Sequence, residues 1–241
     1  MNTSLAGSTV LVTGANGGLG TEFVRQALER GARRVYAAAR RPNSSADERV
    51  VPLALDITDP DAVARAATTA RDVDLVINNA GIAPAGDSIV GAEDEARRIF
   101  ETNFFGTVRV ANAFAPVLAS HGGGTLLNIL SSSAWAPVPT VYAASKAAAW
   151  SATNALRLQL LGQGTHVVGL LVGMIDTPMS ARWDVPKTTP ARVVTQAYDG
   201  IAAGALEVLA DDEAQQLRTL LGTNAEESFP YLAEQLASFH A

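Results

Sequence analysis

The stretch Thr9-Val10-Leu11-Val12-Thr13-Gly14-Ala15-Asn16-Gly17-Gly18-Leu19-Gly20 decides the fold of this 241-residue chain. Its first four residues have the apolar pattern of a short β-strand, and a glycine-rich turn follows. Residues 18–30 are then predicted to form a helix that ends at Gly31. Glycines between a strand and a helix let the backbone approach a pyrophosphate, which meets the free N–H groups of the helix. The stretch therefore predicts a dinucleotide-binding turn, although such a turn alone is also compatible with a plain tight turn.

The alternation of strand and helix continues along the chain. Further strands are predicted at residues 34–39, 51–55, 75–77, 125–130 and 166–172, and helices at residues 60–70, 93–120 and 140–161. Apolar strands that alternate with helices imply a parallel sheet covered on both faces. The fold class expected is α/β, a Rossmann-type doubly wound parallel sheet of about six strands.

The C-terminal part of the sequence has a different pattern. A loop is predicted to about Pro190, followed by helices, two of which flank Thr223-Asn224. No repeat, low-complexity tract or linker divides the chain, so we expect a single domain over residues 1–241. Within it, residues 178–190 are expected to form a substrate lid, and residues 191–241 a helical C-terminal tail.

Composition excludes several classes of function. The net charge of −6 leaves no electrostatic footprint for nucleic acid or an anionic membrane. Without Cys there is no disulfide framework and no thiolate nucleophile, and His121, His166 and His240 lack the spacing of a metal site. No secretory signal opens the sequence, and the longest apolar run is too short to span a bilayer. We therefore expect a cytoplasmic protein without a metal, a nucleic-acid partner or a membrane.

Tyr142 and Lys146 carry the strongest functional signal of the chain. They stand four residues apart in a predicted helix, which places both side chains on one face. An ammonium beside a phenol favours the phenolate, so the tyrosine can exchange a proton at a pH where a free phenol could not. The pair predicts a general acid or base at Tyr142.

Taken together, these motifs resemble those of the short-chain dehydrogenase/reductase family over about residues 8–180. The family motifs match T-G-x-x-x-G-x-G at Thr13, Gly14, Gly18 and Gly20, N-N-A-G at Asn78 to Gly81, a mid-helix Asn at Asn103, and Ser with Y-x-x-x-K at Ser131, Tyr142 and Lys146. The resemblance implies hydride transfer between a nicotinamide cofactor and a ketone or secondary alcohol. Several motifs in the family's order are far more specific than any one of them.

The resemblance also implies the catalytic roles. Tyr142 would be the general acid or base, and Lys146 would lower its proton affinity and hold the nicotinamide ribose. Ser131 would polarise the substrate oxygen, and Asn103 would position a water that links Lys146 to solvent. Because Ser131 lies closer to Tyr142 than the family's serine usually does, Ser132 and Ser133 remain alternatives.

Cofactor contacts follow from the same resemblance. The residues implied, besides Tyr142 and Lys146, are Gly14, Asn16, Gly18, Leu19, Gly20, Arg40, Asp56, Ile57, Asn79, Ala80, Gly81, Gly173, Ile175 and Thr177. Ala39 stands where an acid would accept a hydrogen bond from the ribose 2′-OH of NAD, and Arg40 follows at the position that binds a 2′-phosphate. The cofactor expected is therefore NADP(H). Asp56 would meet the adenine amino group, whereas Asn79 has the alternative role of tying neighbouring strands together.

The substrate pocket is expected to be mostly apolar, which indicates a small uncharged carbonyl compound or alcohol. Its predicted lining is Pro84, Ser133, Trp135, Val138, Met174 and residues 178–187. Trp135 and Trp183 fit equally well as packing residues. The family also implies a homodimer or homotetramer, and the absence of a predicted seventh strand favours the dimer.

An alternative function is a non-catalytic NADP-binding redox sensor or regulator. Such a protein would keep the glycine-rich turn but would need no proton donor. The presence of Asn103, Ser131, Tyr142 and Lys146 together argues against it, because a sensor has no chemical reason to carry all four.

Overall fold

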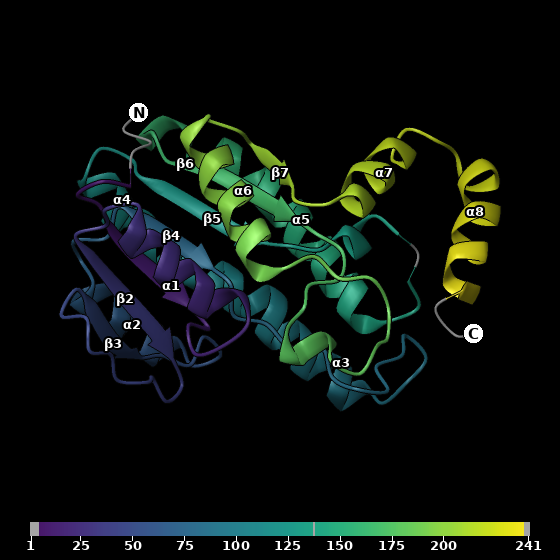
Figure 1. Ribbon diagram of the computed structural model, residues 1–241, viewed down its shortest axis with the longest axis horizontal. Helices are drawn as coiled ribbons and strands as arrows, with labels where there is room; N and C mark the ends of the chain where they lie inside the picture. The colour runs from purple at the N-terminus through teal and green to yellow at the C-terminus, as the bar shows by residue number, and fades with distance from the viewer. Residues whose placement is uncertain (1–4, 137, 239–241) are drawn as a thin grey trace.

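The computed structural model describes residues 5–136 and 138–238. His240 and both ends of the predicted domain, residues 1–4 and 239–241, lie outside the described residues. The described chain forms a seven-stranded parallel sheet in the order β3-β2-β1-β4-β5-β6-β7 (Figure 1). Its strands are β1 (Thr9–Thr13), β2 (Arg34–Ala39), β3 (Val50–Ala54), β4 (Leu75–Asn78), β5 (Thr125–Ile129), β6 (His166–Leu171) and β7 (Glu207–Leu209).

Helices cover both faces of this sheet, as the sequence predicts. The α-helices of the described chain are α1 (Leu19–Glu29), α2 (Pro60–Thr69), α3 (Glu93–Phe100), α4 (Thr107–Ser120), α5 (Val141–Gln159), α6 (Pro190–Ala202), α7 (Asp212–Leu220) and α8 (Ala225–Ser238). On one face, Phe23 of α1 and Tyr198 of α6 pack edge to face in the core. On the other, Phe114 of α4 is fully buried with residues of α2 and α5. Each such buried aromatic contributes about 1.5–3 kcal/mol relative to an exposed one.

The long helix predicted at residues 93–120 is continuous but not uniform. A π-helical turn, Glu101–Gly106, separates α3 from α4. Such a turn widens the helix by one residue and is frequent at functional sites. It contains Asn103, whose side chain is almost completely buried.

The predicted strand count was wrong by one, because β7 lies in the part expected to be helical. This strand has three residues and pairs in parallel with Gly169–Leu171 of β6. Three residues are too few for a period-two pattern to be visible, so tertiary pairing rather than local sequence defines the strand. The helical pieces around Thr223-Asn224 are present as α7 and α8, and Figure 1 shows α8 standing apart from the sheet.

All strands run in the same direction, so their carboxyl ends share one edge of the sheet. The loops that follow β1, β4, β5 and β6 meet there. In open parallel sheets, ligands bind at this edge where the strand order reverses, which here is between β1 and β4. None of the helices in residues 5–136 and 138–238 combines the length and apolarity needed to cross a bilayer.

Candidate active site

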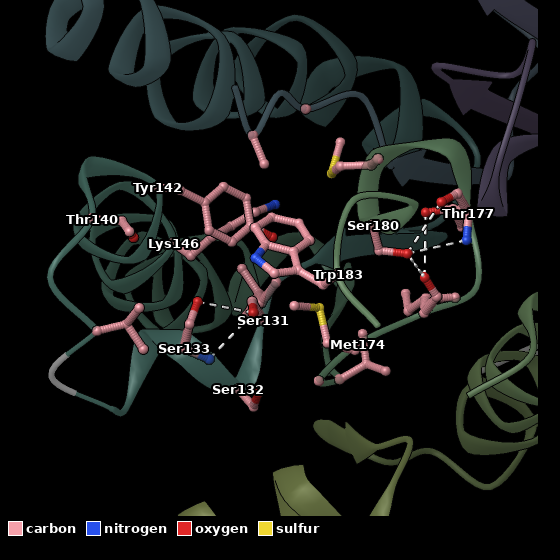
Figure 2. Close-up of a pocket in the computed structure, with 18 of the residues that line it drawn as sticks. Ser131, Ser132, Ser133, Thr140, Tyr142, Lys146, Met174, Thr177, Ser180 and Trp183 are labelled. Atoms are coloured by element: carbon pink, nitrogen blue, oxygen red, sulfur yellow. Dashed lines mark hydrogen bonds between the residues drawn. The ribbon is translucent and has the colours of Figure 1, made fainter. Parts of the chain in front are cut away.

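A cavity of about 1460 Å³ lies at the carboxyl edge of the sheet. The glycine-rich turn and residues 79–81 line one side of it. The remaining lining comes from the loop after β5, the segment after β6, the start of α5 and the first turns of α7. Figure 2 shows part of this lining, with Ser131, Tyr142, Met174 and Trp183 gathered around one hollow.

The turn after β1 has the geometry of a phosphate-binding loop. Gly14 and Gly18 adopt left-handed backbone angles, with φ of +67° and +53°. A Cβ on Gly20 would lie 2.1 Å from the carbonyl oxygen of Gly14, so a side chain cannot be present there. No side chain caps the N-terminus of α1, although the backbone N–H of Gly20 donates to the carbonyl oxygen of Gly17 at 3.0 Å. The turn therefore fits a dinucleotide pyrophosphate.

Two asparagines beside this turn have structural partners. Asn79 donates from Nδ2 to the carbonyl oxygens of Thr13, at 2.8 Å, and Gly14, at 3.2 Å. It therefore ties β4 to β1, as the alternative interpretation of the sequence predicted. Asn16 donates to the carbonyl oxygen of Arg41 at 2.6 Å and accepts from the backbone of Asn43, so it holds the loop after β2.

The three serines after β5 point in different directions. The hydroxyl and the backbone N–H of Ser133 both donate to Ser131 Oγ, at 2.9 and 3.2 Å. Ser132 lies on the far side of Ser131 from Tyr142 and donates to Glu213 Oε1 at 2.8 Å (Figure 2). Among these three serines, Ser131 is the one whose hydroxyl forms a hydrogen bond with Tyr142.

Tyr142 and Lys146 start α5 on the face that borders the cavity. Burial raises the pKa of Tyr142, and hydrogen bonding with Ser131 offsets part of the increase. The Lys146 Nζ lies 5.7 Å from the centre of the Tyr142 ring and donates to the carbonyl oxygen of Ile129 at 2.8 Å. Burial lowers the pKa of Lys146 to about 8. In this structure the pKa of Tyr142 is thus raised overall, because desolvation disfavours the phenolate.

Asn103 lies behind the cavity and holds the segment after β4. Its Oδ1 accepts from the backbone N–H of Ile82 at 2.8 Å, and its Nδ2 donates to the Ile82 carbonyl and to Ser145 Oγ. A Cβ on Gly81 would meet Asn103 Oδ1 at 3.3 Å and Lys146 Nζ at 3.8 Å, which places the two side chains around the same glycine. One acceptor position on Oδ1 remains for a water.

Arg40, Asp56 and Ile57, which are predicted to meet the adenine end of the cofactor, lie outside this cavity. Arg40 is exposed and makes no hydrogen bond or ion pair with the described residues. Hydrogen bonds from Thr58 lower the pKa of Asp56, and the charge of Arg40 adds to the effect. Arg40 therefore presents an unpaired guanidinium near Asp56, at the end of β2.

The substrate side differs from the sequence prediction in one aromatic residue. Trp135 does not line the cavity but packs edge to face against Trp150, with ring centres 6.1 Å apart. Trp183 does line it, with the Arg182 guanidinium 3.7 Å from its ring centre. Arg182 also donates to the carbonyl oxygens of Ala83 and Pro84, which ties the segment after β6 to the loop after β4.

Sequence reasoning missed two groups of residues at the site. The first is the wall formed by α7, where Asp212, Glu213, Gln216 and Leu217 line the cavity. The second is Asp87, whose carboxylate accepts from the backbone N–H groups of Val141, at 3.0 Å, and Tyr142, at 2.8 Å. No local pattern marks these residues, because their partners are distant in the chain.

A model of the short chain dehydrogenase family matches residues 8–187. The chain belongs to this family. Its members are oxidoreductases that use a nicotinamide cofactor, and the site described above holds the family's motif residues in one place.

Individual relatives of this short-chain dehydrogenase agree with that membership. The chain is 32% identical to the 1-deoxy-11-beta-hydroxypentalenate dehydrogenase of Streptomyces avermitilis over 90% of this chain and 82% of the relative. It resembles the crystal structure of a short-chain dehydrogenase from Burkholderia cenocepacia in complex with NADP, with a TM-score of 0.88, 37% identity and coverage of 95% and 99% of the two chains. A Burkholderia phymatum family member in complex with NAD shares the fold, with a TM-score of 0.77 and 20% identity over 89% and 93%.

The cavity of this short-chain dehydrogenase brings together most of its predicted site residues. Those that line it are Gly14, Gly18, Leu19, Asn79, Ala80, Gly81, Ser131, Tyr142, Lys146, Gly173, Ile175 and Thr177. Those that do not are Asn16, Gly20, Asn103, Arg40, Asp56 and Ile57. Asn16, Gly20 and Asn103 lie behind the lining residues or hold their loops in place. Arg40, Asp56 and Ile57 belong to the end of β2 and the loop after β3.

Proposed function

We propose that this dehydrogenase transfers a hydride between NADP(H) and a ketone or secondary alcohol. The observation that carries the proposal is the gathering of Ser131, Tyr142 and Lys146 in the cavity that also contains the glycine-rich turn. A non-catalytic sensor would need the turn but not the other three residues.

The residues of the chain supply the proton and position the carbonyl. When bound, the nicotinamide supplies or accepts the hydride. The Tyr142 hydroxyl donates its proton to the carbonyl oxygen during reduction, and its raised pKa keeps it protonated at neutral pH. Ser131 donates a hydrogen bond to the same oxygen, because Ser133 already occupies its acceptor side.

Lys146 and Asn103 return the proton to Tyr142. With a pKa of about 8, Lys146 gains and loses a proton close to neutral pH. Asn103 holds the Ile82 backbone beside it and keeps one acceptor position for a water. These properties support a relay from solvent through Lys146 to the phenol.

The choice of NADP(H) rests on Arg40. Its guanidinium makes no hydrogen bond or ion pair with the described residues and lies close enough to Asp56 to influence its pKa. A free guanidinium is suited to bind a phosphate through charge-assisted hydrogen bonds. The similar Burkholderia cenocepacia protein, in complex with NADP, supports this choice.

A ketone panel tests the proposed function. Reduction is followed by the loss of NADPH absorbance, with NADH in a parallel series, for aliphatic, cyclic and aromatic ketones. The expected result is turnover of at least one ketone with a preference for NADPH. Tight NADPH binding without turnover of any ketone, alcohol or aldehyde would favour the sensor instead.

We also propose a homo-oligomer that uses α5. On this helix Ser151, Ala155 and Leu158 are exposed, with 78% of the Leu158 side chain accessible. On α4, by contrast, Ala111, Phe114 and Leu118 are buried against the sheet of their own chain, so these residues are not part of a contact. The preference for a dimer over a tetramer depended on the absence of a seventh strand. Because β7 is present, that preference no longer holds. Light scattering decides the state, since the monomer mass is 25.1 kDa.

A further inference from the structure

The carboxylate of Glu213 is held in the wall of the cavity by contacts that span the chain. Its Oε1 accepts from Ser132 Oγ at 2.8 Å, across 81 residues. Asp211 fixes the start of the same helix, because its two oxygens accept from the backbone N–H groups of Gly173 and Ala214 at 2.7 and 2.8 Å. The position of the Glu213 carboxylate is thus set by two independent anchors.

The second oxygen of this carboxylate, Oε2, lies over Gly173, the second residue after β6. A Cβ on Gly173 would lie 2.2 Å from Glu213 Oε2, so the absence of a side chain there makes room for the oxygen. In the described part of the chain, Oε2 has no hydrogen-bond donor and no cationic partner. It is an unused acceptor on a group that borders the cavity.

The surroundings make this acceptor selective. Met174, Trp183 and Leu217 also line the cavity, so a bound substrate that packs on them would exclude water from the Glu213 carboxylate. Glu213 is a solvent-exposed residue in this structure, and partial desolvation of its carboxylate raises its pKa against the hydrogen bond from Ser132. An acceptor that loses its water without a new donor costs about 1–3 kcal/mol. A substrate with a donor at this point avoids that cost.

We propose that Glu213 recognises a hydroxyl or ammonium group on the substrate, set apart from the carbon that receives the hydride. This inference rests on the proposed function and narrows its substrate class to ketones or alcohols with a second, hydrogen-bond-donating group. Ser131 and Tyr142 hold the reacting oxygen, and Glu213 Oε2, in the wall formed by α7, accepts from the donor group.

A purely structural role for Glu213 makes a different prediction. If its carboxylate served to dock α7 on Ser132, its replacement would affect every substrate equally. The helix has other attachments, namely the Asp211 contacts and an ion pair between Arg218 and Glu207 at 3.4 Å. The recognition role therefore requires an effect that depends on the substrate, and this dependence separates the two roles.

The experiment compares matched ketones on the wild type and three variants. The substrates are cyclohexanones and acetophenones that carry hydroxymethyl, aminomethyl, methoxymethyl or ethyl groups at position 3 or 4. The variants are Glu213→Leu, Glu213→Gln and, as a control for charge, Asp212→Asn, which alters the neighbouring acid of the same wall. Thermal unfolding establishes that each variant is folded, and Gln keeps the size of Glu if Leu is not tolerated.

In the wild type, at least one donor-bearing ketone should exceed its ethyl counterpart by about tenfold or more in kcat/KM, mainly through KM. Glu213→Leu should reduce this ratio below about threefold, while Asp212→Asn should preserve it. Glu213→Gln should keep part of a hydroxyl preference and lose an ammonium preference, which distinguishes the two donors.

Three outcomes would overturn the inference. One is a wild-type ratio near one on every scaffold, with the ketones still turned over. Another is an equal loss on all substrates in Glu213→Leu, which would assign Glu213 a structural role. The third, no turnover of any ketone by the wild type, would refute the proposed function itself and the inference with it.

Discussion

The two sides of the cavity are built in different ways. The cofactor side is formed largely by backbone, with Gly14, Gly17, Gly18 and Gly81 among its lining residues. The substrate side is formed by side chains from the loop after β5, from residues 178–186 and from α7. The first side comes from turns that directly follow β1 and β4, whereas the second is assembled from three separate parts of the chain.

This difference separates what is general in the site from what is specific. A backbone cradle binds a phosphate through N–H groups that every residue possesses, so it requires glycines and little else. A substrate pocket discriminates through side chains, and a few of them determine what fits. Variants on the two sides should therefore affect different kinetic constants, which provides ways to test the comparison.

The largest expected effect belongs to the substrate side. Tyr142→Phe should lower kcat by about 10²- to 10⁴-fold, because it removes the proton donor, and should leave the Kd for NADPH within about threefold. Steady-state kinetics and a fluorescence titration measure the two quantities. Tyr36→Phe is the control, since its hydroxyl bonds Asp72 far from the cavity, at 2.9 Å. Activity of Tyr142→Phe near that of the wild type would remove Tyr142 from the proton-donor role.

The reverse pattern is expected for Arg40, which belongs to the proposed cofactor site but lies outside the cavity, at the end of β2. Arg40→Ala should raise the KM for NADPH by about 10- to 100-fold, the equivalent of roughly 1.5–3 kcal/mol for a charge-assisted contact. The KM for NADH and the kcat should change little, because NADH lacks the phosphate. Arg41→Ala, in the adjacent exposed arginine, shows whether the effect is specific. A wild type that prefers NADH would refute the role of Arg40.

Lys146 lies between the two sides, and its titration should appear in the pH dependence of reduction. With its pKa lowered to about 8, kcat/KM should be constant below that pH and fall about tenfold per pH unit above it. Deprotonation of Lys146 does not destabilise the folded protein, so unfolding linked to this residue cannot cause the fall in kcat/KM. Between its folded and unfolded pKa values the unfolded state binds more protons, so its contribution to stability rises with pH. A profile that is flat to pH 10, with unchanged thermal unfolding, would exclude Lys146 from the relay.

The smallest effect concerns the support of Tyr142 from the substrate side. Asp87→Ala removes the acceptor for two N–H groups at the start of α5 and should lower the free energy of unfolding by about 1 kcal/mol. It should also reduce kcat several-fold, because Tyr142 is the second residue of that helix. Urea denaturation and kinetics measure the two effects.

Asp59→Ala is the control, because the Asp59 carboxylate also accepts from two backbone N–H groups at the start of a helix, α2, but away from the cavity. It should lower stability by a similar amount and leave kcat unchanged. Equal kcat values for the two variants would mean that Asp87 supports the fold without positioning Tyr142.

Sequence by itself determined the features that depend on neighbouring residues. The strand-turn-helix at Thr9 to Gly20, the alternation that gives the doubly wound sheet and the i, i+4 pair of Tyr142 and Lys146 all lie within a few turns of chain. Their physical basis is local, namely side-chain periodicity and the backbone freedom of glycine. The family membership that these motifs indicated is borne out by the match over residues 8–187.

Tertiary structure decided the features that depend on contacts between distant segments. β7 exists because its three residues pair with β6, and Trp135 turns from the cavity because Trp150 packs against it. The separation of Ser131 from Ser132 depends on Glu213, which lies 81 residues beyond its hydrogen-bond partner. Such contacts leave no pattern in the sequence around either residue, because each partner is selected by the folded chain and not by its neighbours.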